Sequence, residues 1–205
     1  DDSVIITLPA AVSIDTITVS AHNLSGATVD ALYSATDAAA FISLAGTQAP
    51  DENNSLMFHS STAVSAKRVK ISVAGASGSI YIGYISSGIA LQMQRPFFSG
   101  HDPITDATVT KVYDSLTESG NLIGRSIRSQ GQETSASWKN IDDVWYRSYF
   151  KPFKKSALEL PFVFAWNLLE YPEDVGLCRV DTDIVAPYSG TKKLRAIDIN
   201  LKGAL

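Results

Sequence analysis

The sequence predicts a mainly β protein in two parts, with one helix in the second part. Short apolar runs alternate with polar residues and recur about every 8–14 residues up to Leu91, with no helical pattern between them. Residues 142–158 have helical spacing and an acidic start. Between these regions, residues 86–101 contain Pro96 and Gly100 and interrupt the strand pattern. We therefore expect a β-sandwich over 1–95, and a β-barrel or folded sheet with one helix over 96–205.

The composition is that of a globular chain. Of its 205 residues, 45% are hydrophobic and 19% are charged, which is enough apolar material for packed cores. No apolar run approaches the roughly 20 residues that a membrane span needs, so no membrane span is expected. The net charge of -4 and the pI of about 5.3 argue against specific nucleic-acid binding.

Charge is concentrated after Arg95. Up to Arg95 the chain has 7 acidic and 4 basic residues, and after it 14 acidic and 13 basic residues. This enrichment is expected for a surface that meets protein partners, and a solvated face explains it equally well.

The first part contains the strands of the expected sandwich. The clearest is 68–73, in which Val69, Ile71 and Val73 alternate with polar residues. In the strand 14–21 we expect Ile17 and Val19 to face the core. Pro9 is expected to end the first strand. The other expected strands are 4–8, 28–34, 41–44, 56–60 and 79–85, with a turn at 22–26 and a loop at 46–54. Because the chain begins at Asp1 inside a strand, we expect the N-terminal part of this domain to lie upstream.

The second part is expected to fold as a sheet around one helix. In its last strand, 193–201, the residues Ile197, Ile199 and Leu201 share one side. The other expected strands are 107–116, 121–129, 133–139, 161–166 and 175–184, with polar turns at 118–120, 130–132 and 187–190.

The expected helix begins after Asp142, which is a candidate N-cap. Pro152 is expected to kink or split the helix near Phe150 or Lys151, and Leu160-Pro161 to end it.

The region from Trp145 to Trp166 is the most aromatic in the chain. Trp145, Tyr149, Phe153 and Ala157 recur every four residues and are predicted to form one apolar stripe. In the strand that follows, we expect one face to pack on the helix, and that face carries Phe162, Phe164 and Trp166. The candidate anchors of a core or of an interface are therefore Trp145, Tyr149, Phe153 and Trp166.

Residue patterns typical of catalysis are not found. His22, His59 and His101 are isolated, without a partner at metal-ligand spacing, and are expected to lie at turns or strand edges. The single Cys178 is expected to be a small buried residue in a strand. We therefore expect a protein that is not an enzyme and has no catalytic, metal or cofactor site.

Two segments resemble proteins of tailed phages and prophages. The first comprises 17–26, 69–73 and 81–91, with the closing segment Gly88-Ile-Ala-Leu-Gln-Met-Gln-Arg-Pro96. It resembles the discoidin-like, galactose-binding-like β-sandwich of such proteins, which implies a jelly roll. Sugar-binding relatives hold their ligands in loops at one end. The corresponding loops, 35–37 and 48–54, contain neither a Trp nor an Arg cluster.

The second segment comprises Gly124-Arg-Ser-Ile-Arg128, Trp145 to Phe153, and Pro161 to Trp166. It is similar to distal-tail and tail-tube-related proteins that pair a strand–helix–strand unit with a β-barrel. The two resemblances imply a structural virion protein, made in the host cytoplasm, that forms a ring in the distal tail or baseplate. Its implied partners are other copies of itself and neighbouring tail proteins. The alternative is a carbohydrate-binding module that holds a host-surface glycan through the first domain.

Overall fold

The computed structural model describes residues 2–50, 52, 54–190 and 193–203, which form two compact units. The first unit comprises Asp1–Gln92 and Val163–Leu177, and the second comprises Met93–Phe162 and Cys178–Leu205. The fold is mainly β, with two antiparallel sheets and one continuous helix, as the sequence predicted. Sequence reasoning assigned 163–177 to the second part, whereas the structure groups this segment with the first unit.

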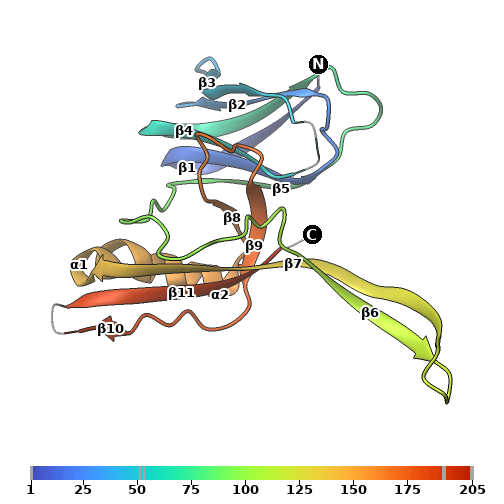
Figure 1. Cartoon of the computed structure of the whole chain (residues 1–205). Coiled ribbons are helices and arrows are strands. Elements are labelled where there is room, and N and C mark those ends of the chain that lie inside the picture. The colour runs from blue at the N-terminus through green and yellow to red at the C-terminus, as the bar shows by residue number, and fades with distance from the viewer. Residues whose placement is uncertain (1, 51, 53, 191–192, 204–205) are drawn as a thin grey trace. The chain divides into compact units, whose positions relative to one another are not determined.

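The sheet of the first unit has the strand order β3-β2-β4-β1-β5 (Figure 1). The five strands are β1 (Asp2–His22), β2 (Thr28–Ser34), β3 (Ile42–Gln48), β4 (Leu56–Ala74) and β5 (Ile82–Gly88).

Strands β1 and β4 are each longer than the sequence indicated. They pair with each other along three stretches, which are 2–7 with 68–73, 12–14 with 64–66 and 16–19 with 56–59. The predicted end of the first strand at Pro9 is wrong. Proline lacks an N–H group, and its effect here is a register shift between Thr7 and Val12 instead of a strand end.

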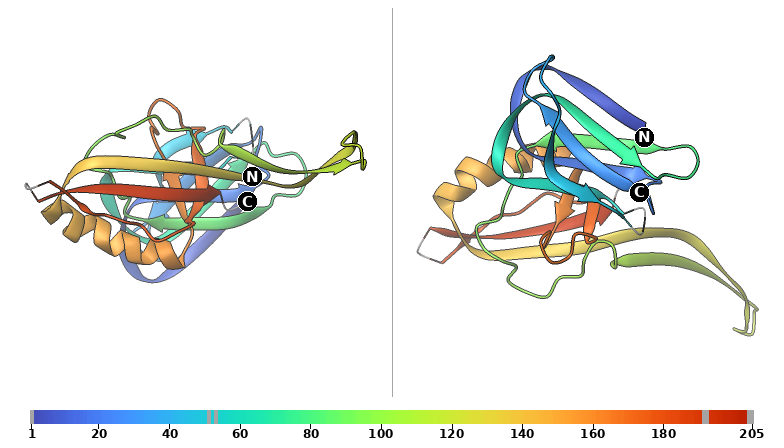
Figure 2. Two further views of the ribbon diagram at one scale, coloured as in Figure 1. Left: turned by 60° about the horizontal axis from the view of Figure 1, so that its bottom comes forward. Right: turned by 90° about the horizontal axis from the view of Figure 1, so that it is seen from above.

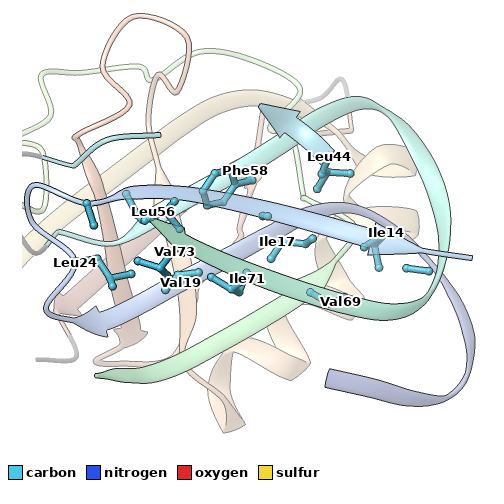
Figure 3. Close-up of a cluster of buried hydrophobic side chains, with 14 residues drawn as sticks. Ile14, Ile17, Val19, Leu24, Leu44, Leu56, Phe58, Val69, Ile71 and Val73 are labelled. Carbon is cyan, nitrogen blue, oxygen red and sulfur yellow. The ribbon is translucent and has the colours of Figure 1, made fainter. Parts of the chain in front are cut away.

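The core of the first unit is formed mainly by residues from β1, β2, β3 and β4 (Figure 3). Ile17 and Val19 are completely buried, and Val69, Ile71 and Val73 are buried along β4, as their alternation predicted. Thr16 and Thr18, on either side of Ile17 in β1, are also buried, and each hydrogen-bonds a side chain of a neighbouring strand. Thr16 hydrogen-bonds His59 at 3.0 Å, and Thr18 hydrogen-bonds Ser86 at 2.6 Å.

The second sheet has the strand order β6-β7-β11-β9-β8, and β10 pairs with β11 (Figure 1). Its strands are β6 (Thr108–Leu116), β7 (Leu122–Asp142), β8 (Phe162–Ala165), β9 (Val175–Val180), β10 (Tyr188–Ser189) and β11 (Leu194–Gly203). Ile197, Ile199 and Leu201 are buried on β11 as predicted, and Ile197 lies opposite Trp138 of β7. Cys178 is also buried as expected, and burial raises the pKa of its thiol to about 12.

The sequence predicted two strands with a turn at 130–132 between them, whereas the structure has one continuous strand, β7. Gln130 pairs with Thr110, and Gly131 pairs with Val109. The ladder to β6 therefore continues through the expected turn. The N-terminal part of β7 pairs with β6, whereas 133–142 pair with β11.

The helix is continuous but changes type in its middle. It consists of α1 (Asp143–Trp145), a π-helical segment η1 (Tyr146–Phe150) and α2 (Lys151–Glu159). The Asp142 side chain accepts hydrogen bonds from the N–H groups of Val144 and Trp145, so it is the predicted N-cap. The helix ends at Leu160, which is extended.

Pro152 widens the helix instead of splitting it. Its ring lacks an N–H group and would clash with the carbonyl four residues earlier in a regular α-helix. The preceding turn is π-helical, and the Lys151 N–H bonds to the Tyr146 carbonyl five residues back.

The buried side of the helix differs from the predicted stripe. Ala157 is buried as predicted, together with Tyr146 and Phe150 outside the predicted stripe, whereas Tyr149 is 61% exposed. A spacing of four drifts around a helix of 3.6 residues per turn, so twelve residues do not return to one face. Tyr146, Phe150 and Ala157 are separated by four and then seven residues, and this spacing keeps them on one side of the helix.

Candidate assembly surface

The most exposed element of the second unit is a two-stranded ribbon made of β6 and residues 122–130 of β7. Every residue of β6 and every residue of 122–130 is exposed. Figure 1 and Figure 2 show this ribbon extending beyond the rest of its sheet. It nevertheless carries large apolar side chains, which are those of Val109, Val112, Tyr113, Leu116, Leu122, Ile123 and Ile127.

The cross-strand register assigns these side chains to faces. Val112 lies opposite Ile127, and Leu116 lies opposite Leu122. Residues directly opposite each other share a face, and so do residues two apart on one strand. Val112 and Leu116 are four residues apart on β6 and share a face, and a register shift between Ser115 and Leu116 brings Leu122 opposite Leu116. The two aliphatic pairs therefore lie on one face of the ribbon. Their exposed fractions range from 44% for Val112 to 61% for Ile127.

An ion pair lies between the two aliphatic pairs on the same face. Arg125 donates from Nε to Asp114 Oδ1 at 2.7 Å and from Nη2 to Oδ2 at 3.0 Å. The Arg125 guanidinium holds the pKa of the Asp114 carboxyl below its usual value of 3.8, chiefly through this hydrogen bonding. Along this face, which we call the Asp114 face, an aliphatic pair, a charge pair and a second aliphatic pair follow one another.

Among the described residues, no further strand pairs with the edges of the ribbon. β6 is the end strand of its sheet, and the pairing of β7 with β11 begins at Glu133. Within the described part of the chain, 122–130 pair only with β6. A two-stranded ribbon by itself is marginally stable in water, and open edges with apolar side chains are templates for association.

Three of the four aromatic anchors predicted from the sequence belong to the helix. The ring centroid of Trp145 lies 6.1 Å from that of Tyr149 and 6.4 Å from that of Phe150. Phe153 contacts Phe150 at 5.6 Å, and it meets Phe162 edge-on at 5.0 Å, which is the predicted contact between helix and strand. Tyr149 points to solvent.

Trp166 lies beyond the end of β8, in the part of the chain grouped with the first unit. It is 37% exposed and stacks on Tyr171 with ring centroids 5.3 Å apart. Its Nε1 donates to Asp174 Oδ2 at 2.9 Å. Trp166 is thus held by the loop that follows it, and its ring remains partly open to solvent.

The histidines are spread over both units. His22 is buried at the end of β1, not in the expected turn, and its Nδ1 accepts a hydrogen bond from the Leu24 N–H at 3.3 Å. His101 stacks on Phe97 in the second unit. Among the residues with described positions, no group of three or more His, Cys, Asp or Glu side chains could hold a metal ion.

Sequence reasoning predicted the hairpin but missed its exposure. The strands 107–116 and 121–129 and the turn between them were expected, but whether another layer covers a hairpin depends on residues distant in the sequence. The available signal was the occurrence of Val112, Leu116, Leu122 and Ile127 on strands without a clean polar face.

No helix in the described ranges is long and apolar enough to cross a membrane. Comparison with protein-family models, with curated proteins and with solved structures finds no match to this chain.

Proposed function

We propose that this chain is a structural protein of a tailed-phage virion that assembles into a ring in the distal tail or baseplate. Within this proposal, the first unit is a galactose-binding-like sandwich and the second is a distal-tail-like sheet with its helix. The protein is made in the host cytoplasm and becomes part of the particle. Its partners are further copies of itself and adjacent tail proteins, and the proposal includes no chemical reaction.

The observation that supports this proposal best is the exposed β6–β7 ribbon. Its aliphatic cross-strand pairs are open to water in the single chain, and its edges are available for pairing. Burial of such surface against another protein is favourable, at about 25 cal/mol for each Å² of apolar area removed from water. Apolar cores with polar rims are typical of assembly interfaces.

The mass of the purified full-length chain tests this proposal. Light scattering at micromolar concentration should show an oligomer, and electron microscopy should show a closed ring. Ile127→Ser should weaken the assembly, because it places a hydroxyl on the Asp114 face. Ile42→Ser is the matched control, since Ile42 is similarly exposed on β3 of the first unit. A wild-type chain that stays monomeric, alone and with neighbouring tail proteins, would contradict the proposal.

A second candidate function is glycan binding by the first unit, favoured by the Trp166–Tyr171 pair. Exposed aromatic rings beside carboxylates are suited to stacking on sugar rings, and Asp174 and Glu170 lie in the same loop. Titration with host-surface polysaccharide tests this candidate. Trp166→Ala should abolish binding, whereas Tyr81→Ala, at another exposed tyrosine of this unit, should not. Absence of binding by the wild-type chain would rule this candidate out.

A further inference from the structure

The residues of the Asp114 face are ordered so that two copies of this face can complement each other. Each of its three cross-strand levels contains one residue from β6 and one from β7: Val112 with Ile127, Asp114 with Arg125, and Leu116 with Leu122. The two outer levels are aliphatic on both strands, and the middle level has opposite charges on the two strands.

This order restricts how two such faces can stack. A two-fold axis parallel to the strands places β6 of one copy over β7 of the other. Asp114 of each copy then faces Arg125 of the other, and the aliphatic levels face each other. A two-fold axis across the strands, centred on the charge level, places β6 over β6 and brings like charges together. Like charges that face each other across an interface lower its affinity, and the loss ranges from several-fold to many-fold.

We propose that two copies of this chain pair through their Asp114 faces, with the ribbons parallel and with Asp114 of one copy against Arg125 of the other. This proposal rests on the assembly role of the ribbon proposed above and specifies the occupant of that surface as a second copy. The charge pair sets the register, and the flanking aliphatic levels supply the apolar contact.

A two-fold contact also restricts the stoichiometry. It is isologous, because the same residues are used by both copies. A closed assembly that contains such a contact has an even number of copies. The mass measured for the wild-type oligomer should therefore be an even multiple of the chain mass of 22.0 kDa.

Exchange of the two charges provides a test that keeps the ribbon's own ion pair. In the double variant Asp114→Arg with Arg125→Asp, the cross-strand pair is retained with reversed polarity. Two copies of this variant still oppose unlike charges, so it should self-associate like the wild type. A wild-type copy and a variant copy would oppose like charges at both positions, so they should not pair.

The measurement is co-expression of two differently tagged full-length chains, followed by purification on one tag. The control is wild type with wild type. For wild type with the exchanged variant, we expect at least a roughly tenfold lower recovery of the second tag, since like charges face each other. Recovery equal to that of the control would overturn the proposal, and recovery above it would indicate the crossed arrangement with β6 over β6.

Like-charge variants give an independent check. Asp114→Lys carries two positive charges at the middle level, and Arg125→Glu carries two negative charges. Each alone should be defective in pairing, and a mixture of the two should restore it. If the wild type assembles but mixing restores nothing, the proposed face pairing is wrong while the assembly role stands. If the wild type never assembles, both proposals fail.

Discussion

The guanidinium of Arg195 in β11 donates from Nε to Oδ1 of Asp143, the first residue of the helix, 52 residues earlier in the chain. The Arg195 guanidinium also lies over the rings of Tyr146 and Tyr188, at 4.3 and 4.1 Å from their centroids. Its Nη1 donates to the Ala186 carbonyl at 2.7 Å. One arginine therefore joins the start of the helix to β11 and to the chain before β10.

Replacement of Arg195 should destabilise the second unit. Arg195→Ala removes the ion pair, the carbonyl contact and both ring contacts, and we expect the thermal midpoint to fall by several degrees. Arg195→Lys keeps the charge but loses the planar stacking, so its effect should be intermediate. Arg147→Ala is the control, because Arg147 also bonds Asp143 but is largely exposed. Equal midpoints for Arg195→Ala and Arg147→Ala by circular dichroism would contradict this assignment.

Asp143 should contribute to stability against acid. Hydrogen bonds from Arg147 and then Arg195 lower the pKa of its carboxyl from 3.8 to about 2. The unfolded chain therefore takes up the proton at higher pH than the folded chain. The contribution is complete above 3.8 and is lost as the pH falls from 3.8 towards 2. Denaturant titrations across this range should show a smaller pH dependence for Asp143→Asn than for the wild type.

The two faces of the helix should respond differently to truncation. Phe150 is completely buried, whereas Tyr149 is mostly exposed. Phe150→Ala should cost about 3–5 kcal/mol of unfolding free energy, because it leaves a cavity. Tyr149→Ala should change it by less than about 0.5 kcal/mol, as is usual for surface positions. Denaturant unfolding checks both values. A larger loss for Tyr149→Ala than for Phe150→Ala would support the apolar stripe predicted from the sequence. A Tyr149→Ala chain that folds normally but fails to assemble would identify Tyr149 as an interface residue.

The first unit should lose stability in mildly acidic solution because of His22. Burial lowers the pKa of its imidazole below 6.5, and Nδ1 must be unprotonated to accept from the Leu24 N–H. The stabilising contribution of the neutral ring is present above 6.5 and decreases as the pH falls below that value. Melting curves from pH 8 to pH 5 should show this loss in the wild type and less of it in His22→Gln. If His22→Gln loses as much stability between pH 8 and pH 5 as the wild type does, His22 is excluded as the cause.

Local chemistry in the sequence determined the elements that depend on near neighbours. Asp142 caps the helix because its carboxylate reaches N–H groups two and three residues ahead. The alternation at Val69, Ile71 and Val73 identified a buried strand face, since side chains alternate across a strand. The mainly β class and the position of the single helix follow from such short-range patterns.

Tertiary structure decided everything that depends on partners far along the chain. Pro9 and Gly131 favour breaks locally, but β1 resumes its pairing with β4 beyond Pro9, at Val12, and the pairing of β7 with β6 includes Gly131. The helix buries Phe150 and not Tyr149, because the π-helical turn before Pro152 and packing in the second unit determine which face is covered. The pairing of Arg195 with Asp143, the grouping of 163–177 with the first unit and the exposure of the β6–β7 ribbon have no local signature. Each arises from the packing of residues distant in the chain, which periodicity along a single strand or helix does not encode.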